Sequence, residues 1–366
     1  MSLRLPRRAL ACIATSLLVV ASATTTLAQS PAKTRPGASP TAAAFNYAQS
    51  DAAMAFARDL AGRRDLDPAW VRQHLGAAQR IPAVIRLMQP APSGTPKNWA
   101  AYRARFIEPV RLRAGQRFWE DNREALARAE DQYGVPASLI VGVIGVESLY
   151  GRHTGNFRVI DALATLSFDF PESHPRAATR SAFFRDELEQ FLSLAERTGT
   201  DPASYLGSYA GAMGWPQFMP SSWTKYAIDF DADGRVDLFN SQADVIGSVA
   251  NYFKAFGWQP GLPTHYPVRF DPNQSPQDLA TLLAPDILPS FSVETFNEKG
   301  VRIESPLAPQ HSGKLALVEL ENAGAPSTYI AGTENFYVVT RYNWSSYYAL
   351  AVIELGEAVR ETLGER

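Results

Sequence analysis

The residues from 135 to 151, VPASLIVGVIGVESLYG, constrain the fold of this chain more than any other stretch. They predict a short helix, because Pro136 suits a first helical position and Gly151 suits a C-terminal stop. Apolar residues occupy nearly every side of this helix, which is typical of a helix inside a core. One carboxylate, Glu147, interrupts the apolar pattern near the end of the helix.

The carboxyl group of Glu147 is the first candidate for chemistry. Burial makes an ionised carboxylate costly and raises its pKa. A carboxylic acid that stays protonated near neutral pH can act as a general acid. Two other interpretations are open at this point, because Glu147 could pair with a buried Arg or could emerge into water at the helix end.

The N-terminal residues indicate export. Three arginines precede a largely apolar run over residues 9–20, and Thr26-Leu27-Ala28 forms a small-residue cleavage site, so residues 1–28 are predicted to be a signal peptide. The apolar run is short for a membrane span, and we expect no transmembrane segment in the mature chain. Cys12 lies inside the run rather than after it. We therefore expect no lipid anchor.

The composition of the mature chain excludes several functions. Residues 1–28 contain three Arg, no acid and the only Cys, so their removal changes the formal net charge from −2 to −5 and leaves no disulfide. A mildly acidic chain without a run of Lys and Arg gives no support for nucleic-acid binding. The five scattered histidines and the lack of a Gly-x-Ser-x-Gly elbow give little support for a zinc or Ser-His-Asp hydrolase. No organic cofactor is predicted.

Composition and hydrophobic periodicity divide the remaining chain. They predict a disordered linker over 29–44, a helical domain over 45–134, a helical core over 135–258, a small β domain over 259–339 and a C-terminal helix over 340–366. Within the β domain we expect short strands around residues 266–270, 291–293, 301–303, 315–318 and 337–339, and a helix around 279–283. The fold class is α+β and mainly α.

An acidic loop from Asp229 to Asn240 has the ligand spacing of an EF-hand. Asp229, Asp231 and Asp233 occupy positions one, three and five, Gly234 follows, Arg235 would offer a backbone carbonyl and Asp237 a carboxylate. Asn240 replaces the usual Glu at position twelve, and Asp244 could supply that carboxylate. A solvated acidic turn, and a capping box formed by Ser241 with Asp244, are the alternatives. We expect structural calcium, because such close acids repel one another without a cation.

Aromatic residues later in the chain have two interpretations. The block over residues 207–223 combines small residues that permit close backbone approach with aromatic faces and the amide of Gln217. Several tyrosines elsewhere fall on or beside apolar stripes, which is equally typical of a core. Asn343 could be the N-cap of the last helix.

The sequence resembles the lytic murein transglycosylase B family (glycoside hydrolase family 103), exported enzymes that cleave bacterial peptidoglycan. The resemblance covers roughly residues 45–363, and the matching segments are residues 145–152, 161–166 with 170–171, 211–222, 246–253 and 340–343. It implies a lysozyme-like helical core, a flanking helical domain and a small inserted β domain. It also implies that the last helix returns to the core.

The resemblance implies roles for individual residues. Glu147 matches the catalytic acid/base. The matched substrate-binding residues are Tyr102, Arg180, Ser208, Gln217, Phe218, Tyr252, Tyr342, Asn343 and Tyr348. The calcium loop has a family counterpart, with Asp229, Asp231, Asp233, Arg235, Asp237 and Asp244 as the metal-binding residues here. The implied partners are peptidoglycan glycan strands in the periplasm and other cell-wall enzymes. The usual lipid anchor of the family is missing from this sequence.

The implied reaction needs one carboxyl group, whereas ordinary glycosidases use two. Glu147 would protonate the oxygen of the β-1,4 bond between MurNAc and GlcNAc and then take a proton from the MurNAc 6-hydroxyl, which closes a 1,6-anhydro ring. Two alternatives are a muramidase that uses water and a calcium-stabilised wall-binding protein with a dead site. Intact Glu147, Gln217-Phe218 and Tyr342-Asn343 argue against the dead site.

Overall fold

The computed structural model describes residues 45–90, 94 and 96–364, so the predicted signal peptide and linker lie outside the described residues. The described chain forms two compact units. The first unit contains residues 94–153 and 226–364, and the second contains residues 45–90 and 154–225.

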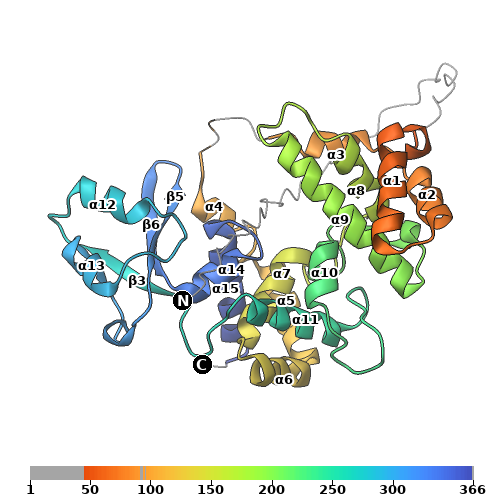
Figure 1. Ribbon diagram of the computed structural model, residues 1–366. Helices are drawn as coiled ribbons and strands as arrows, with labels where there is room; N and C mark the ends of the chain where they lie inside the picture. Colours follow the sequence, from red (N-terminus) through yellow and green to blue (C-terminus); the bar gives the residue numbers. More distant parts are fainter. Residues whose placement is uncertain (1–44, 91–93, 95, 365–366) are drawn as a thin grey trace, which may run out of the picture. The chain divides into compact units, whose positions relative to one another are not determined.

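Two helices in direct contact form the centre of the first unit. These are α7 (Ala137–Ser148) and α15 (Ser346–Thr362), which lie together in Figure 1. Glycines allow the close approach, because a Cβ on Gly142 would lie 2.1 Å from the carbonyl oxygen of Val352 and one on Gly356 would lie 2.0 Å from that of Ser138. The other helices of this part are α4 (Trp99–Arg103), α5 (Pro109–Asp121), α6 (Arg123–Tyr133), α11 (Gln242–Ala255) and α14 (Glu334–Thr340).

An antiparallel sheet of order β4-β3-β6-β5 also belongs to the first unit. Its strands are β3 (His265–Phe270), β4 (Val301–Ile303), β5 (Ala316–Asn322) and β6 (Ala325–Gly332). Helices α12 (Pro276–Leu283) and α13 (Val293–Glu298) lie beside this sheet in Figure 1. They bury Leu282 and Phe296 in the core of this region. Ala323 and Gly324 have positive φ, which matches the turns of tight hairpins.

The structure confirms the predicted strands around 266–270, 301–303 and 315–318 and the helix around 279–283, and it corrects two strand predictions. Residues 291–293 lead into α13, because the Ser292 side chain accepts the Thr295 N–H and caps a helix there. Residues 337–339 lie in α14, whose N-cap Thr333 accepts the Asn335 N–H. Short apolar runs have no decisive period, so helix caps decide their structure.

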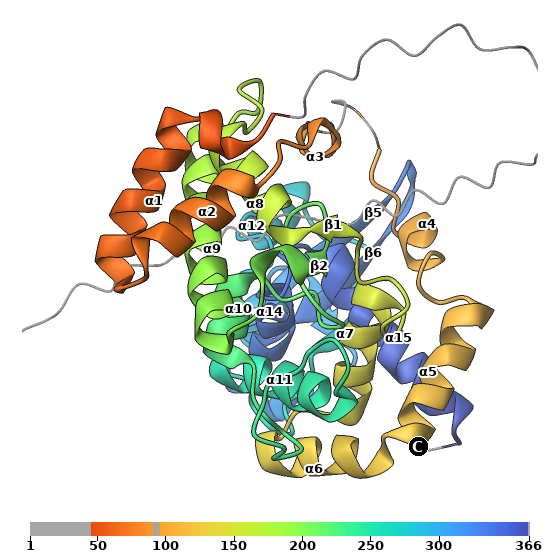
Figure 2. The ribbon, with the colours of Figure 1, turned by 90° about the vertical axis from the view of Figure 1, so that its right-hand side faces the viewer.

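The second unit is helical. Its helices are α1 (Asp51–Arg64), α2 (Pro68–Ala77), α3 (Pro82–Leu87), α8 (Val159–Phe168), α9 (Ala177–Thr198) and α10 (Pro220–Tyr226). The two-residue strands β1 (Phe157–Arg158) and β2 (Leu206–Gly207) pair in antiparallel fashion. Helix α8 is buried along nearly its whole length and packs against α9, as Figure 2 shows.

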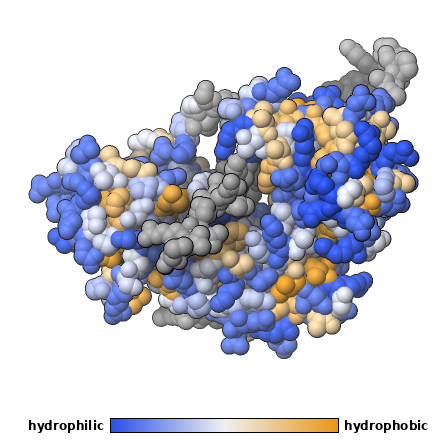
Figure 3. All heavy atoms as spheres, viewed as in Figure 1, coloured by the Kyte–Doolittle hydropathy of each residue, from blue (hydrophilic) through white to orange (hydrophobic). Residues whose placement is uncertain are grey.

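The described surface is mixed in polarity. On the face in Figure 3, hydrophilic side chains are widespread and hydrophobic ones form scattered groups. Among the described residues, no helix combines the length and apolar character needed to cross a membrane.

Candidate active site

Helix α7 places Glu147 in its last turn. The structure confirms the all-apolar helix, since every residue of α7 except Glu147 is buried. The helix ends at Ser148 rather than continuing to Gly151, because Leu149 and Tyr150 already adopt left-handed conformations with φ of 51° and 55°. The Ser148 hydroxyl accepts the Gly151 N–H at 3.0 Å and so stabilises this early turn.

The side chains of Tyr150 and Arg111 support the same turn. The Tyr150 ring stacks on Phe118, and its hydroxyl lies where a Cβ on Gly145 would be only 2.5 Å away. Arg111 donates from Nε to the Gly145 carbonyl at 3.0 Å. A small residue is therefore needed at position 145, two residues before Glu147.

The surroundings of Glu147 raise its proton affinity. Burial raises its pKa to about 7, and the hydrogen bond from the Tyr348 hydroxyl to Oε1, at 2.5 Å, opposes that rise. The described part of the chain gives Glu147 no ion pair, so the structure does not support the buried Arg pair that the sequence left open. The side chain is still partly accessible. Such a group can hold a proton near neutral pH and present it to a substrate.

The four tyrosines predicted to bind substrate all lie in the first unit. Tyr348 is fully buried and stacks on Tyr342 with ring centroids 6.3 Å apart, and Tyr342 lies 4.8 Å from Tyr252. Burial and then the charge of Glu147 raise the pKa of Tyr102 to about 12, and the same two causes raise that of Tyr342. Their hydroxyls therefore remain protonated donors around Glu147.

Asn343 lies beside this group with an open acceptor. Its side chain is 8% exposed, and within the described residues its Oδ1 has no hydrogen-bond partner. Ser345, not Asn343, is the N-cap of α15, because the Ser345 hydroxyl accepts the Tyr348 N–H. The N-cap alternative for Asn343 is therefore wrong. A buried, unsatisfied amide oxygen is more consistent with a ligand contact.

The other predicted substrate-binding residues lie in the second unit. The Ser208 hydroxyl accepts the Ala212 N–H at 3.0 Å, and Gln217, whose φ is 51°, donates from Nε2 to the carbonyls of Thr154 and Gly214. Phe218 is only 2% exposed and pairs through its backbone with Met213. The structure thus gives these three residues defined local positions, and their contact with substrate stays a prediction.

Arg180 on α9 is buried rather than on a surface. It is 2% exposed, and its guanidinium lies 5.6 Å from the ring centroid of Phe170 and 5.5 Å from that of Phe184. Burial lowers its pKa. Its predicted contact with a peptide stem remains untested.

Two acids near Glu147 in the sequence are engaged within the second unit. Asp161 pairs with Arg158 at 2.7 Å and accepts the Gln79 N–H at 2.9 Å. Asp169 accepts the Tyr47 hydroxyl at 2.6 Å and pairs with Arg80 at 2.8 Å. Both carboxylates therefore have structural partners, which agrees with a mechanism that uses Glu147 alone.

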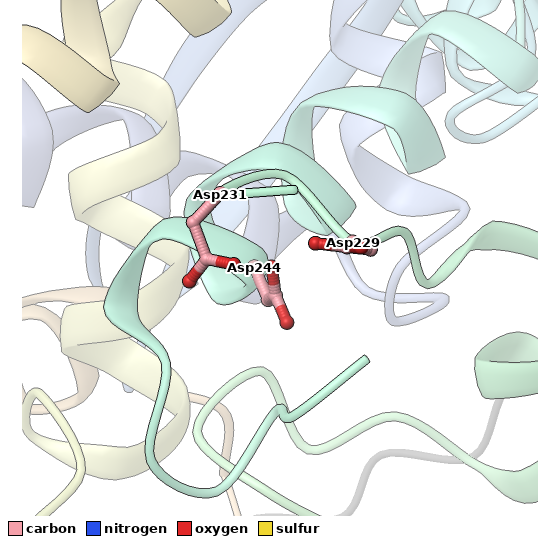
Figure 4. A group of neighbouring side chains, drawn as sticks. All are labelled: Asp229, Asp231 and Asp244. Atoms are coloured by element: carbon pink, nitrogen blue, oxygen red, sulfur yellow. The ribbon is translucent and has the colours of Figure 1, made fainter. Parts of the chain in front are cut away.

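The acidic loop brings three of its predicted ligands together. Oxygens of Asp229, Asp231 and Asp244 all lie within 4.8 Å of one another, and Figure 4 shows the three carboxylates converging. The carboxylate of Asp244 accepts the N–H groups of Phe230 and Asp237, while Ser241 caps α11 as predicted. Asp244 thus closes the loop.

The remaining predicted ligands make other contacts. Asp237 accepts the N–H groups of Phe239 and Asn240, both at 2.9 Å, and Asp233 accepts the Arg235 N–H at 2.9 Å. The grouped carboxylates are hard oxygen donors of the kind that calcium prefers, so this donor set fits the ion.

Sequence reasoning missed Arg111 and Tyr150 as supports of the Glu147 turn. Arg111 lies 36 positions before Glu147 in an amphipathic helix and carries no local signal of its role. Tyr150 and Gly145 belong to the matched segment around Glu147, which was the available hint.

Comparisons with known proteins bear on the whole arrangement. A family model described as "Transglycosylase SLT domain" matches residues 48–357. The chain is 38% identical over 322 residues to the membrane-bound lytic murein transglycosylase B of Escherichia coli K12, covering 86% of this chain and 84% of that protein.

Solved structures show the same likeness. The Escherichia coli lytic transglycosylase SLT35 in complex with bulgecin A has a TM-score of 0.74 at 38% identity, covering 87% of this chain and 96% of that chain, and SLT35 was also solved in complex with calcium. SltB3 of Pseudomonas aeruginosa in complex with NAG-anhNAM-pentapeptide has a TM-score of 0.69 at 29% identity, covering 84% and 78%. These matches confirm the mainly α, lysozyme-like fold class and the resemblance found in the sequence. The chain belongs to the lytic transglycosylase family that carries the transglycosylase SLT domain.

Proposed function

We propose that this protein cleaves the β-1,4 bond between MurNAc and GlcNAc in peptidoglycan and forms 1,6-anhydro-MurNAc, with Glu147 as the single acid and then base. The carrying observation is the isolated Glu147 carboxyl group, whose pKa is raised to about 7 and whose Oε1 accepts the Tyr348 hydroxyl. Family membership and the anhydro-sugar ligand of SltB3 support the same reaction.

The first step transfers the Glu147 proton to the glycosidic oxygen. The C1–O bond of MurNAc breaks, the GlcNAc hydroxyl leaves with that proton, and an oxocarbenium-like centre forms at C1. Glu147 is now a carboxylate, and the Tyr348 hydroxyl at 2.5 Å stabilises it. The N-acetyl group of the substrate stabilises the cationic centre.

The second step uses a nucleophile inside the substrate. The Glu147 carboxylate takes the proton of the MurNAc 6-hydroxyl while O6 bonds to C1, which closes the anhydro ring and restores the acid. No water enters the product, and an internal hydroxyl has a high effective molarity. An apolar helix that presents one carboxyl group suits this requirement.

Substrate binding is assigned to groups around Glu147. The protonated hydroxyls of Tyr102 and Tyr342 and the open Oδ1 of Asn343 supply donors and an acceptor for sugar hydroxyls and amides. Tyr252 donates to the Arg341 carbonyl at 2.7 Å and so supports Tyr342. Ser208, Gln217, Phe218 and Arg180 keep their predicted roles toward the glycan and the peptide stem.

Digestion of purified sacculi tests the reaction. The muropeptides released are weighed by mass spectrometry. Anhydro ends support the proposal, reducing ends would replace it with a water-using muramidase, and absence of any product would favour a wall-binding protein. Glu147→Gln, which keeps the size of the side chain, should abolish the product while the protein stays folded.

We also propose that the acidic loop binds a structural calcium ion. The support is the convergence of Asp229, Asp231 and Asp244 and the structure of SLT35 in complex with calcium. Arg235 would add its backbone carbonyl, and Asp233 and Asp237 complete the predicted set. Equilibrium dialysis against calcium, with Asp244→Asn as the comparison, measures this binding.

Location and domain boundaries complete the proposal. The predicted signal peptide at residues 1–28 supports a periplasmic location, and the place of Cys12 inside its apolar run supports a protein without a lipid anchor. The relative from Escherichia coli is named membrane-bound. Fractionation and N-terminal sequencing should give a periplasmic chain beginning at Gln29, and Cys12→Ala should not change this. The domain boundaries at residues 45, 135, 259 and 340 remain predictions, and limited proteolysis tests them. Assembly with other cell-wall enzymes is also a prediction, and affinity capture tests it.

A further inference from the structure

We propose that the tip of the β5–β6 hairpin, residues 321–325, positions Tyr102 and Tyr348 beside Glu147, so that Asn322 and Tyr347 are positioning residues of the reaction. This inference rests on the proposed function. All the groups concerned lie in the first unit.

The hairpin tip is shaped to bond outside its own sheet. The register between β5 and β6 shifts between Leu320 and Asn322, so Glu321 has no residue paired with it across the ladder. Such an irregularity turns backbone groups away from the neighbouring strand. The N–H and the carbonyl of Glu321 are thereby available to another element.

The first outside contact of the tip is with α4, the helix that carries Tyr102. The Asn322 side chain accepts the Ala100 N–H at 3.0 Å, and the Ala323 N–H donates to the Lys97 carbonyl at 2.9 Å. From its other side, Asn322 donates through Nδ2 to the Pro326 carbonyl at 2.9 Å. One side chain therefore links β6 to the first turn of α4, and β5 and α4 lie close together in Figure 1 and Figure 2.

The second contact is with the start of α15. The Tyr347 hydroxyl accepts the Glu321 N–H at 2.6 Å and donates to the Glu321 carbonyl at 3.2 Å. The next residue, Tyr348, donates to Glu147. The Tyr347 ring also meets the edges of Trp99 and Tyr102, with centroids 6.0 and 5.9 Å away.

The tip thus joins the two helix starts whose tyrosines surround Glu147. Its bonds are largely exposed, and the Lys97–Glu321 ion pair at 3.5 Å has both side chains more than half exposed, so we expect each to add little to stability. Their effect on activity should be larger, because small displacements of substrate-positioning groups are costly in rate.

Two variants and a matched control test this. Tyr347→Phe keeps the ring but removes its bonds to Glu321, and Asn322→Ala removes the link to Ala100. Each should lower kcat/KM for anhydro-muropeptide release about tenfold, with a melting temperature within about 3 °C of wild type. The control is Tyr329→Phe, which removes the 2.7 Å hydrogen bond from the Tyr329 hydroxyl on β6 to Glu319 on β5. This bond stays within the sheet, so kcat/KM should not change.

Rescue and coupling separate positioning from general support. Asn322→Asp keeps the acceptor for the Ala100 N–H but loses the donor to the Pro326 carbonyl, so it should recover part of the loss. In a protein that already carries Tyr102→Ala, adding Asn322→Ala should lower kcat/KM by less than about twofold, because the effect of Asn322 passes through Tyr102.

The outcomes are distinct. The positioning role would be overturned if Asn322→Ala and Tyr347→Phe kept the kcat/KM of Tyr329→Phe. It would also be overturned if the losses from Asn322→Ala and Tyr102→Ala were fully additive. Neither result would contradict the reaction itself. A fall in melting temperature above about 10 °C would assign the tip a structural role instead. A wild-type protein that forms no anhydro product would overturn the proposed function itself, and the positioning role with it.

Discussion

Glu147 at the end of α7 and Asp231 in the acidic loop are carboxyl groups whose pKa values shift in opposite directions. Glu147 ends an apolar helix and receives one hydroxyl donor, and burial raises its pKa to about 7. In the loop, the Ser241 hydroxyl donates to Asp231 at 2.6 Å and the Asp233 N–H donates as well, and these bonds lower the pKa of Asp231. The number of hydrogen-bond donors and the depth of burial, more than the residue type, decide whether the pKa of a carboxyl group rises or falls.

The largest expected effect tests the Glu147 side of this comparison. Glu147→Gln cannot exchange a proton and should reduce anhydro-product formation by about 10³-fold or more. Glu130 lies on α6, and its side chain accepts the Ala137 N–H at the start of α7. Glu130→Gln keeps an amide oxygen that can still accept this N–H and should retain activity. Product quantified from sacculi checks both, and residual activity above about one tenth of wild type would contradict the role.

Glu147→Gln should also be more stable than wild type in alkaline solution. Folded Glu147 has a pKa of about 7 against an ordinary 4.5, so the folded state holds the extra proton between these values and the unfolding free energy falls as pH rises through them. Removing the carboxyl should therefore stabilise the protein at pH 8 by up to about 3 kcal/mol. Equal denaturation curves at pH 8 would show that the site does not penalise the charge.

The next effect tests the rigid backbone beneath Glu147. Gly142→Ala would place a Cβ 2.1 Å from the Val352 carbonyl oxygen and force α7 and α15 apart. We expect a loss of about 3 kcal/mol and a lower melting temperature. Gly62 in α1 is the control, because a Cβ added there would meet no atom within 4 Å. Gly62→Ala should be neutral or stabilise the protein by up to about 1 kcal/mol, and calorimetry compares the two variants.

A smaller effect tests the loop side. Removal of calcium by a chelator should lower the melting temperature by several degrees, because a bound ion at about 100 times its Kd contributes about 2.7 kcal/mol. Asp229→Asn should remove this response, whereas Asp131→Asn, exposed on α6, should keep it. Melting curves that do not change with chelator in wild type would contradict a bound ion.

The smallest effect tests the hydroxyl donor of Glu147. Tyr348→Phe removes the donor that lowers the Glu147 pKa, so that pKa should rise further. The acid form would then persist to higher pH, and the alkaline fall in kcat/KM should move upward by up to about one unit, with a several-fold lower maximum. Tyr329→Phe is the control, and an unshifted profile would assign the pKa to burial alone.

Much of this arrangement was predictable because it is written in local sequence. The apolar residues around Glu147 have no period that leaves a polar face, so a buried helix follows. The loop from Asp229 places its acids at fixed spacing, and the Ser241 cap is a local pattern. The strands at 291–293 and 337–339 were predicted wrongly, because capping by Ser292 and Thr333 outweighed a short apolar run.

The sequence by itself determined that one acid would end an apolar helix and that a cluster of acids would form a loop. Only the tertiary structure decided what surrounds them. Tyr348 reaches Glu147 from 201 positions away, and Arg111 reaches Gly145 from 34. Asn322 at the hairpin tip bonds to α4, and Tyr347 on α15 bonds to Glu321 at the same tip. No local sequence pattern predicts either contact. Hydrogen bonds between distant segments depend on packing, and the pKa of Glu147 depends on burial, so neither can be read from neighbours in the chain.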